Sequence, residues 1–346
     1  MIVAFLLGSA FEFSGLSTKI FKNAATPKRL RSLFYQAVVM YLLFRIGFKG
    51  GVSITSEPLN EVLFTSFIAA AAAVVWTFFI LSVLKRWSPF SRLTQISIAA
   101  HFGSVSVGTF VAGLAFLAAL NIEVSGSVAV WLAVMELPAI LVGMWMLKIS
   151  FAQVFKILIE DRSLMILLFA IAFGIAAPNL IPTDAQKLLF TTIFTPLLVY
   201  FLFEMGRKAT ASFGQLKGNL GSVIMVGVLL PILGGALGVS MGALVGYTEG
   251  QAFMLGLLMA SASYVLAPIS LNQILNSLYH PTAPEIKNVV AVSMALSVGV
   301  TLPFNVLIGF ELYYLLIKAV SVVPALALVS FAVLGLVWGV SLMGKK

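Results

Sequence analysis

Glycine and hydroxyl residues interrupt one strongly apolar stretch of the chain, and residues of these types can bind small ions. The stretch is Ile96–Gly113, and the residues that interrupt it are Gly103, Ser104, Ser106, Gly108 and Thr109. Lipid offers no hydrogen-bond partner to backbone groups, so a loosened segment at bilayer depth is tolerated only where it lines a cavity or is buried in protein. This stretch is therefore the first candidate for a binding site.

A second hydroxyl-rich stretch, Ser261–Ser270, lies about 161 residues further along the chain. It contains Pro268, which lacks an amide hydrogen and clashes with the preceding turn, so a helix should break or kink there. The N-termini of half-helices attract anions, while their C-termini and hydroxyl groups offer oxygen atoms to a cation such as sodium. Two such breaks predict a site for a small anion and a cation near the middle of a membrane.

Few ionisable residues fall inside the apolar segments. Glu136 lies in mid-segment next to Pro138, and a carboxylate at that depth requires a cation or proton partner, so we expect a coupling-ion role or a buried hydrogen-bonded carboxyl. For His101 we expect a neutral imidazole satisfied by a neighbouring carbonyl, although a proton relay or a bond to substrate is an alternative. Arg45 and Glu204 lie near segment ends, where ion pairing or snorkelling is expected.

Ser240 lies in a formal GxSxG sequence, Gly238–Gly242, which in a hydrolase would mark a nucleophilic serine. Here it belongs to a series of glycines four residues apart, which favours close helix packing. His280 is expected in a loop on the opposite side of the membrane. An intramembrane serine protease is therefore a remote alternative.

The composition indicates a polytopic membrane protein. Of 346 residues, 61% are hydrophobic and 10% are charged, against about a quarter charged in a soluble domain. The net charge of +9 is better explained by basic loops than by nucleic-acid binding. The chain has no cysteine, which excludes disulfides and thiolate metal sites, and no cofactor is expected beyond a coupling sodium ion.

Segments of about 20 apolar residues can each cross a membrane. The apolar N-terminus has no basic residues before it and is expected to be a retained first span rather than a signal peptide. The eleven expected spans are 2–17, 31–48, 61–84, 94–120, 127–147, 164–181, 187–205, 220–246, 250–277, 288–316 and 319–342.

The basic residues between these spans predict the orientation. Seventeen lysines and arginines fall on one side and three, Lys49, Lys187 and Lys318, on the other. Loops rich in basic residues stay in the cytoplasm, so the N-terminus is expected outside and the C-terminus inside.

An internal repeat predicts the architecture. Tyr41–Gly47 (YLLFRIG) matches Tyr200–Gly206 (YFLFEMG) at four of seven positions, and Leu137-Pro138 pairs with Leu302-Pro303. An odd number of spans in each half reverses their orientation, which gives a 5+5 inverted repeat typical of transporters. We expect an all-α membrane protein with repeats at 1–159 and 160–317, crossed broken helices, and an appended helix at 318–346. Chance similarity between apolar segments is the alternative.

Five motifs in order resemble the sodium-dependent bicarbonate transporter family of cyanobacteria and related bacterial permeases. The resemblance covers nearly the whole core, spans one to ten. The motifs are IGFKGGVSI (46–54), FGSVSVGT (102–109), MELPAIL (135–141), MGRKATASFGQLK (205–217) and ASASYVLAP (260–268).

The resemblance implies sodium-coupled uptake of bicarbonate through a fold similar to that of sodium/proton antiporters, in a bacterial cytoplasmic membrane. It implies substrate contacts from Gly103, Ser104, Val105, Ser106, Gly108, Thr109, Ser261, Ala262, Ser263 and Tyr264. Cation ligands would be Ser104, Ser106, Glu136 and Ser263, and helix breaks are expected at Gly103, Pro138, Pro268 and Pro303.

Three positions depart from the family pattern. Tyr264 stands where the family has an acidic residue, and a phenol does not replace a carboxylate as a charged sodium ligand near neutral pH. Glu204 is an additional acidic residue, and the last span is an extension. These departures leave a carrier of a larger organic anion, or a proton-coupled permease, as alternatives.

The sequence thus predicts a secondary carrier that works by alternating access. Its expected partners are a small anion and the lipid bilayer, while a homo-oligomer and a soluble regulator are left open. A channel is an alternative of another class, and it would show non-saturating flux without coupling.

Overall fold

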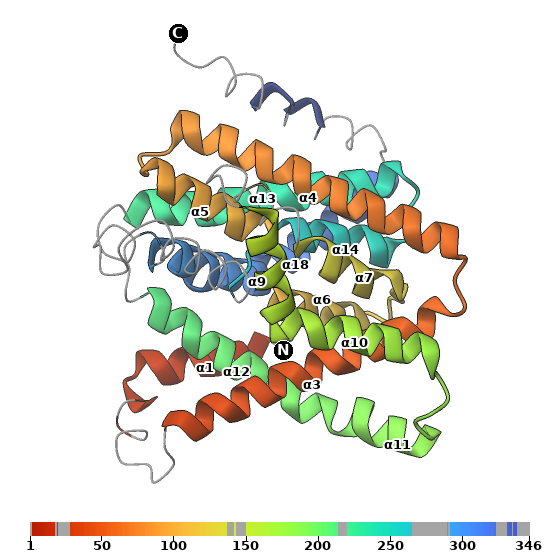
Figure 1. Ribbon diagram of the computed structural model, residues 1–346. Helices are drawn as coiled ribbons and strands as arrows, with labels where there is room; N and C mark the ends of the chain where they lie inside the picture. Colours follow the sequence, from red (N-terminus) through yellow and green to blue (C-terminus); the bar gives the residue numbers. More distant parts are fainter. Residues whose placement is uncertain are drawn as a thin grey trace.

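The protein is described here from a computed structural model (Figure 1). The structure describes residues 2–17, 19, 28–136, 142, 150–213, 220–264, 289, 291–322, 331–333 and 335–337. Within these ranges the regular secondary structure is helical, as the sequence predicts.

Six helical segments of the described residues are long and apolar enough to cross a membrane. Two shorter apolar helices, α1 (Ile2–Phe13) and α10 (Arg162–Ala176), accompany them. These segments fall on eight of the eleven expected spans. The six long segments are Arg29–Ile54, Leu59–Trp87, Arg92–Ala119, Thr183–Phe213, Leu220–Leu244 and Ala291–Ser321.

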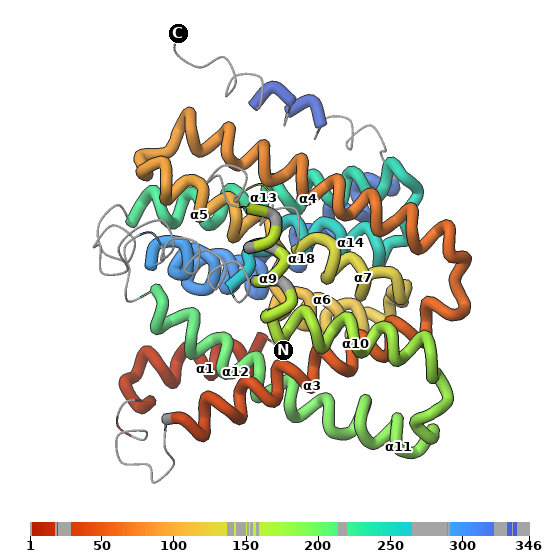
Figure 2. The backbone as a smooth tube through the Cα atoms, viewed as in Figure 1, coloured from red at the N-terminus to blue at the C-terminus, as the bar shows by residue number. Residues whose placement is uncertain are grey.

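The helices form two layers with shorter elements between them (Figures 1 and 2). One layer contains α1, α3 (Lys28–Ile54), α10 and α12 (Phe194–Phe213). The other contains α4 (Leu59–Trp87) and α13 (Leu220–Leu244), with α5 (Arg92–Gly103) beside them. Between the layers lie α6 (Val107–Ala119), α7 (Ser127–Val134), α14 (Glu249–Met259) and α18 (Phe310–Val322). Other described helices include α9 (Phe151–Glu160), α11 (Thr183–Lys187) and the π-helical turn η1 (Leu188–Thr192).

Helices of the first layer pack closely through glycines. Gly206 of α12 lies against the backbone of Phe5 in α1, and Gly47 of α3 lies against Leu167 and Ala170 of α10. A methyl group at either glycine would overlap its neighbour, because the nearest atoms belong to backbone or to Cβ. The two glycines close the matching YLLFRIG and YFLFEMG sequences, so the same motif makes the same kind of helix contact twice.

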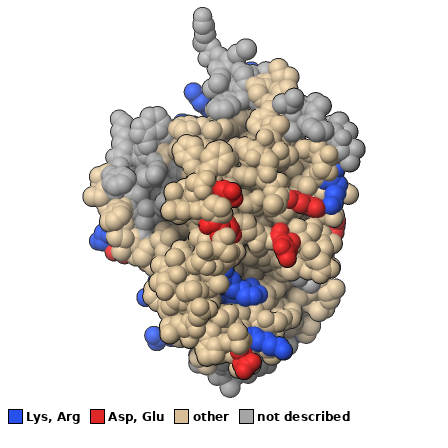
Figure 3. Space-filling view, turned by 90° about the vertical axis from the view of Figure 1, so that its right-hand side faces the viewer, with Lys and Arg blue, Asp and Glu red and all other residues tan. Residues whose placement is uncertain are grey.

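One face of the molecule is largely uncharged. Figure 3 shows a face on which acidic and basic residues gather in a few small groups among other residue types. Large apolar side chains such as Phe64, Phe67 and Phe169 are exposed, as suits residues that face lipid.

The helix that contains Pro303 continues through this residue, so the expected break there is wrong. Leu302–Phe304 (α17) is a short α-helical piece between two π-helical segments, Ala295–Thr301 (η2) and Asn305–Gly309 (η3). Proline removes one helical hydrogen bond, and a wider π-turn accommodates the lost bond without ending the helix. The expected breaks at Pro138 and Pro268 lie outside the described residues.

Candidate functional site

The first predicted break is present between α5 and α6. The α5 helix ends at Gly103, and Ser104 and Ser106 have extended backbone angles before α6 begins at Val107. Ser106 caps α6, because its Oγ accepts a hydrogen bond of 3.2 Å from the Thr109 amide. The predicted residues of this break, Gly103–Ser106, Gly108 and Thr109, are all buried.

A second break follows α14, which begins in a capping box at Thr248 and ends at Met259. Residues 260–264 are not helical, and Ser261, Ala262 and Ser263 are buried. The Ser261 Oγ donates to the Leu258 carbonyl at 2.8 Å, which satisfies one carbonyl at the end of α14.

The two breaks are hydrogen-bonded to each other. The Ser106 amide donates to Ser261 Oγ at 3.0 Å, and the Ser263 amide donates to the His101 carbonyl at 2.7 Å. One bond therefore runs in each direction between segments about 160 residues apart. The structure brings the serines of the predicted site together at a buried contact.

Two polar atoms beside this contact have no hydrogen-bond partner among the described residues. They are Ser104 Oγ, in the break itself, and His101 Nε2, in the last turn of α5. The other ring nitrogen, Nδ1, lies 2.8 Å from the Ser97 carbonyl and must donate to it, since a carbonyl only accepts. In a neutral ring Nε2 is then an acceptor. The expected bond to a carbonyl therefore satisfies one of the two ring nitrogens and leaves the other without a partner.

Tyr264 lies beside the first turn of α6. Its hydroxyl lies next to Gly108, and the Ser106 and Tyr35 hydroxyls are its polar neighbours. A side chain at position 108 would collide with this hydroxyl and press on the Phe201 ring. Tyr264 thus touches the first break directly.

A line of buried polar residues supports the site and was not predicted. The residues recur every fourth position along one helix, which places them on one face. They are Ser293, Ser297, Thr301 and Asn305. The fourfold spacing of polar residues in an apolar segment was the sequence signal for them.

Asn305 connects this line to the second break. Its Nδ2 donates to the Ala260 carbonyl at 2.9 Å, and its Oδ1 accepts from the Tyr313 hydroxyl at 2.8 Å. At the other end, the Ser293 and Ser97 hydroxyls are 2.6 Å apart, which connects the line to α5. We call the place where the two breaks are hydrogen-bonded the crossing. The polar line therefore holds the helices on both sides of the crossing.

Glu136 is buried, with 5% of its surface exposed, and directly follows Met135, the C-cap of α7. Its electrostatic neighbour among the described residues is Asp161, which caps α10 through a bond of 2.7 Å from the Leu164 amide. Burial raises the pKa of the Asp161 carboxyl, while bonds from the Leu164 and Ser163 amides oppose this shift. The part of Glu136 in a cation site stays a prediction.

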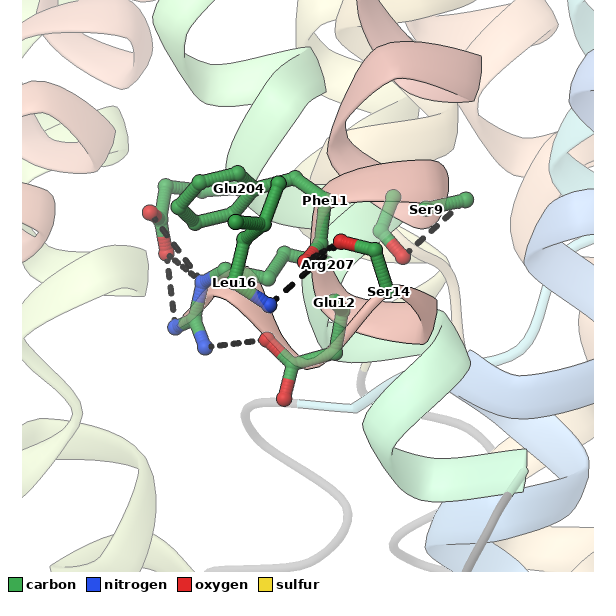
Figure 4. A network of polar contacts seen from close by, with 8 residues as sticks. Ser9, Phe11, Glu12, Ser14, Leu16, Glu204 and Arg207 are labelled. Atoms are coloured by element: carbon green, nitrogen blue, oxygen red, sulfur yellow. Dashed lines mark hydrogen bonds and ion pairs between the residues drawn. The ribbon is translucent and has the colours of Figure 1, made fainter. Parts of the chain in front are cut away.

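Glu204 forms an ion pair, which is one of the two outcomes expected for it. Arg207 bridges Glu204 and Glu12 with Nη–Oε distances of 3.0 Å each, and so joins α12 to α1 (Figure 4). Arg45 does not pair with a carboxylate among the described residues. Its Nε donates to the Phe190 carbonyl at 2.7 Å, and its guanidinium lies 3.4 Å from the centre of the Phe194 ring.

Ser240 lies within α13, which is a continuous helix from Leu220 to Leu244. The glycines on both sides of it pack against α14: Gly238 on Gly256 and Gly242 on Ala252. This placement fits helix packing rather than a nucleophile on a strand-to-helix turn.

A comparison with protein families gives one assignment. The family model of the Na⁺-dependent bicarbonate transporter superfamily matches residues 11–318. No curated protein matches the chain. The matched range includes both breaks and the polar line on the helix of Asn305.

Proposed function

Because the chain belongs to the Na⁺-dependent bicarbonate transporter superfamily, we propose that it is a secondary carrier that couples bicarbonate uptake to sodium. The observation that supports this most is the direct bonding of two helix breaks in the buried interior, through Ser106–Ser261 and Ser263–His101. Paired breaks of this kind provide free backbone hydrogen-bonding groups at a membrane depth where lipid provides no hydrogen-bond partner.

The groups at the crossing suit bicarbonate. The N-terminus of α6 offers partial positive charge to the oxygens of an anion, and Gly108 places no side chain between a ligand and the backbone. Ser104 Oγ adds a hydroxyl, and His101 Nε2 adds an acceptor. Bicarbonate carries both acceptor oxygens and one O–H donor, so it can satisfy all of these groups.

A sodium ion would bind oxygen atoms near the same place. In this proposal the ligands are carbonyls at the end of α5 and the hydroxyls of Ser104, Ser106 and Ser263, with Glu136 as the charged ligand. Unwound carbonyls and half-helix C-termini are the usual sodium ligands in transporters with broken helices.

We also propose the inverted repeat, with halves 1–159 and 160–317 and the appended segment 318–346. The packing of helices supports it. Span two (α3) packs on span six (α10), and span seven (α12) packs on span one (α1), which is the pattern that exchanging two equivalent halves would produce. The pairs α4–α5 and α13–α14 are equivalent in the same way.

Alternating access then follows from relative motion of the two layers around the crossing. In this proposal the protein lies in a bacterial inner membrane, and the charge bias supports an outside N-terminus and a cytoplasmic C-terminus. A homo-oligomer and a soluble regulator are compatible with this proposal, which depends on neither.

Flux into proteoliposomes tests the proposal. Labelled bicarbonate should accumulate when sodium is higher outside and should not accumulate when the sodium gradient is abolished. Uptake that is unchanged without the gradient would show that the carrier is not sodium-coupled.

Glu136→Gln should remove most of the sodium dependence while bicarbonate still binds, because the carboxylate is the charged ligand in this proposal. Uptake as a function of sodium concentration measures the effect. The matched control is Glu160→Gln, since Glu160 is an exposed carboxylate that pairs with Lys156 on the surface. Wild-type sodium dependence in Glu136→Gln would remove this residue from the cation site.

Tyr264 favours a second candidate, a carrier of a larger organic anion. It replaces the acidic residue that the family pattern has at this place and lies against the first break. Thermal stabilisation of the purified protein by a panel of small inorganic and organic anions separates the candidates, because a ligand well above its dissociation constant stabilises by a few kcal/mol.

A further inference from the structure

The amides at the start of α6 already have partners within the protein. The Ser106 amide donates to Ser261 Oγ, and the Thr109 amide donates to Ser106 Oγ. The Gly108 amide faces the Tyr264 hydroxyl. The first two partners are short serine side chains built into the breaks, whereas the third is the tip of a long side chain.

The Tyr264 side chain is held at this place from outside the breaks. Its hydroxyl faces that of Tyr35 in α3. The Tyr35 ring stacks on Phe201 of α12, with centroids 6.2 Å apart and planes at 11°. The Lys208 ammonium lies 3.2 Å from the centre of the Tyr35 ring. Tyr264 and Tyr35 therefore lie between the crossing and the charged end of α12, where Arg207 binds Glu204.

Unpartnered buried atoms indicate that a ligand belongs at the crossing. Ser104 Oγ and His101 Nε2 are both fully buried, and neither has a hydrogen-bond partner in the described part of the chain. Buried polar atoms of this kind are rare without a bound ligand or water. An anion placed to bind Ser104 and the start of α6 would compete with the Tyr264 hydroxyl for the Gly108 amide.

We propose that Tyr264 is an internal competitor of the anion and, with Tyr35, closes the site toward the Lys208 end of the molecule. The inference rests on the proposed anion site at the crossing. In this structure the phenol occupies the α6 N-terminus, and anion binding displaces it. Displacement breaks the contact with Tyr35 and connects the site to the side of the membrane that carries Lys208.

The bicarbonate affinity of variants that each lack one tyrosine hydroxyl tests the competition. Tyr264→Phe removes the hydroxyl that faces Gly108 and should raise bicarbonate affinity roughly 2- to 10-fold, the change expected when a competing polar group worth about 1 kcal/mol is removed. Tyr35→Phe should also raise the affinity, but more weakly. It should add nothing to Tyr264→Phe, because Tyr35 acts only through the Tyr264 hydroxyl.

Tyr200→Phe is the matched control, because Tyr200 packs on Phe34 away from the breaks. It should leave the affinity unchanged. Unchanged or weaker binding in Tyr264→Phe would overturn the proposal, and weaker binding would make the hydroxyl a ligand of the anion instead.

Accessibility tests the closure without relying on transport. The chain has no cysteine, so Ser104→Cys introduces a single thiol into the buried break. An anionic, membrane-impermeant thiol reagent should label this thiol slowly from the Lys208 side, and adding Tyr264→Ala should speed labelling at least 10-fold. Equal rates with and without Tyr264→Ala would contradict the closure.

The two proposals can fail separately. If bicarbonate neither stabilises nor enters with the wild-type protein, the proposed function is wrong while the labelling experiment still decides the closure. If bicarbonate binds to the wild type and Tyr264→Phe behaves as the wild type does, only the inference about Tyr264 is wrong.

Discussion

Gly206→Ala is expected to destabilise the folded protein by about 1–3 kcal/mol, the usual range for an extra methylene in a packed core. A Cβ at this position would overlap the Phe5 carbonyl and lie 3.0 Å from the Ser9 amide nitrogen. Backbone atoms cannot change rotamer, so α1 and α12 must move apart. Thermal unfolding of the purified protein in detergent measures the loss.

Gly221→Ala is the control for this change. Gly221 is also helical, in the first turn of α13, and has no atom within 4 Å of an added Cβ. Alanine favours helix over glycine by about 1 kcal/mol, so Gly221→Ala should be neutral or stabilising. If the two variants were equally stable, the close α1–α12 packing would be contradicted.

Asn305→Leu is expected to lower stability by about 1–3 kcal/mol and to reduce transport at least 10-fold. The change removes the donor to the Ala260 carbonyl, and an unsatisfied buried group costs energy of this order. It also removes one acceptor of the Tyr313 hydroxyl, which can then donate its single proton to the Pro231 carbonyl 3.1 Å away. The second break would lose its anchor, so its geometry at the crossing should change.

Asn60→Leu provides the control, because Asn60 is exposed in the first turn of α4. Unfolding midpoints and initial uptake rates of both variants should be compared at equal reconstitution. Wild-type uptake by Asn305→Leu would show that this anchor does not hold the second break.

The sequence predicts the first break well because its cause is local. Glycine and serines between apolar residues interrupt a helix wherever backbone groups find partners, and Gly103–Ser106 does so. The helix continues through Pro303 for a reason that local sequence does not contain. Whether a proline ends a helix or sits between π-turns depends on the packing around it, here including the Thr301 hydroxyl, which donates to the Gly227 carbonyl of α13.

The residues of the site also divide into those that local sequence predicts and those that depend on packing between distant segments. Ser104, Ser106, Ser261 and Ser263 follow from their residue types in apolar segments. The partners of Tyr264 come from α3 and α6, distant in sequence, and nothing in a single chain fixes which tyrosine faces which amide. Asn305 and the serines on its helix could have been predicted from their fourfold spacing, because that spacing selects one buried face.

Linkage between the two ligands tests the shared site most directly. If sodium and bicarbonate bind side by side at the crossing, sodium raises the affinity for bicarbonate, and bicarbonate raises the affinity for sodium by the same factor. Calorimetric titration of the purified protein with bicarbonate at low and at saturating sodium, and the converse titration, measures both factors. Equal factors of about 5 or more are expected. Bicarbonate binding that is indifferent to sodium would contradict a common site at the two breaks.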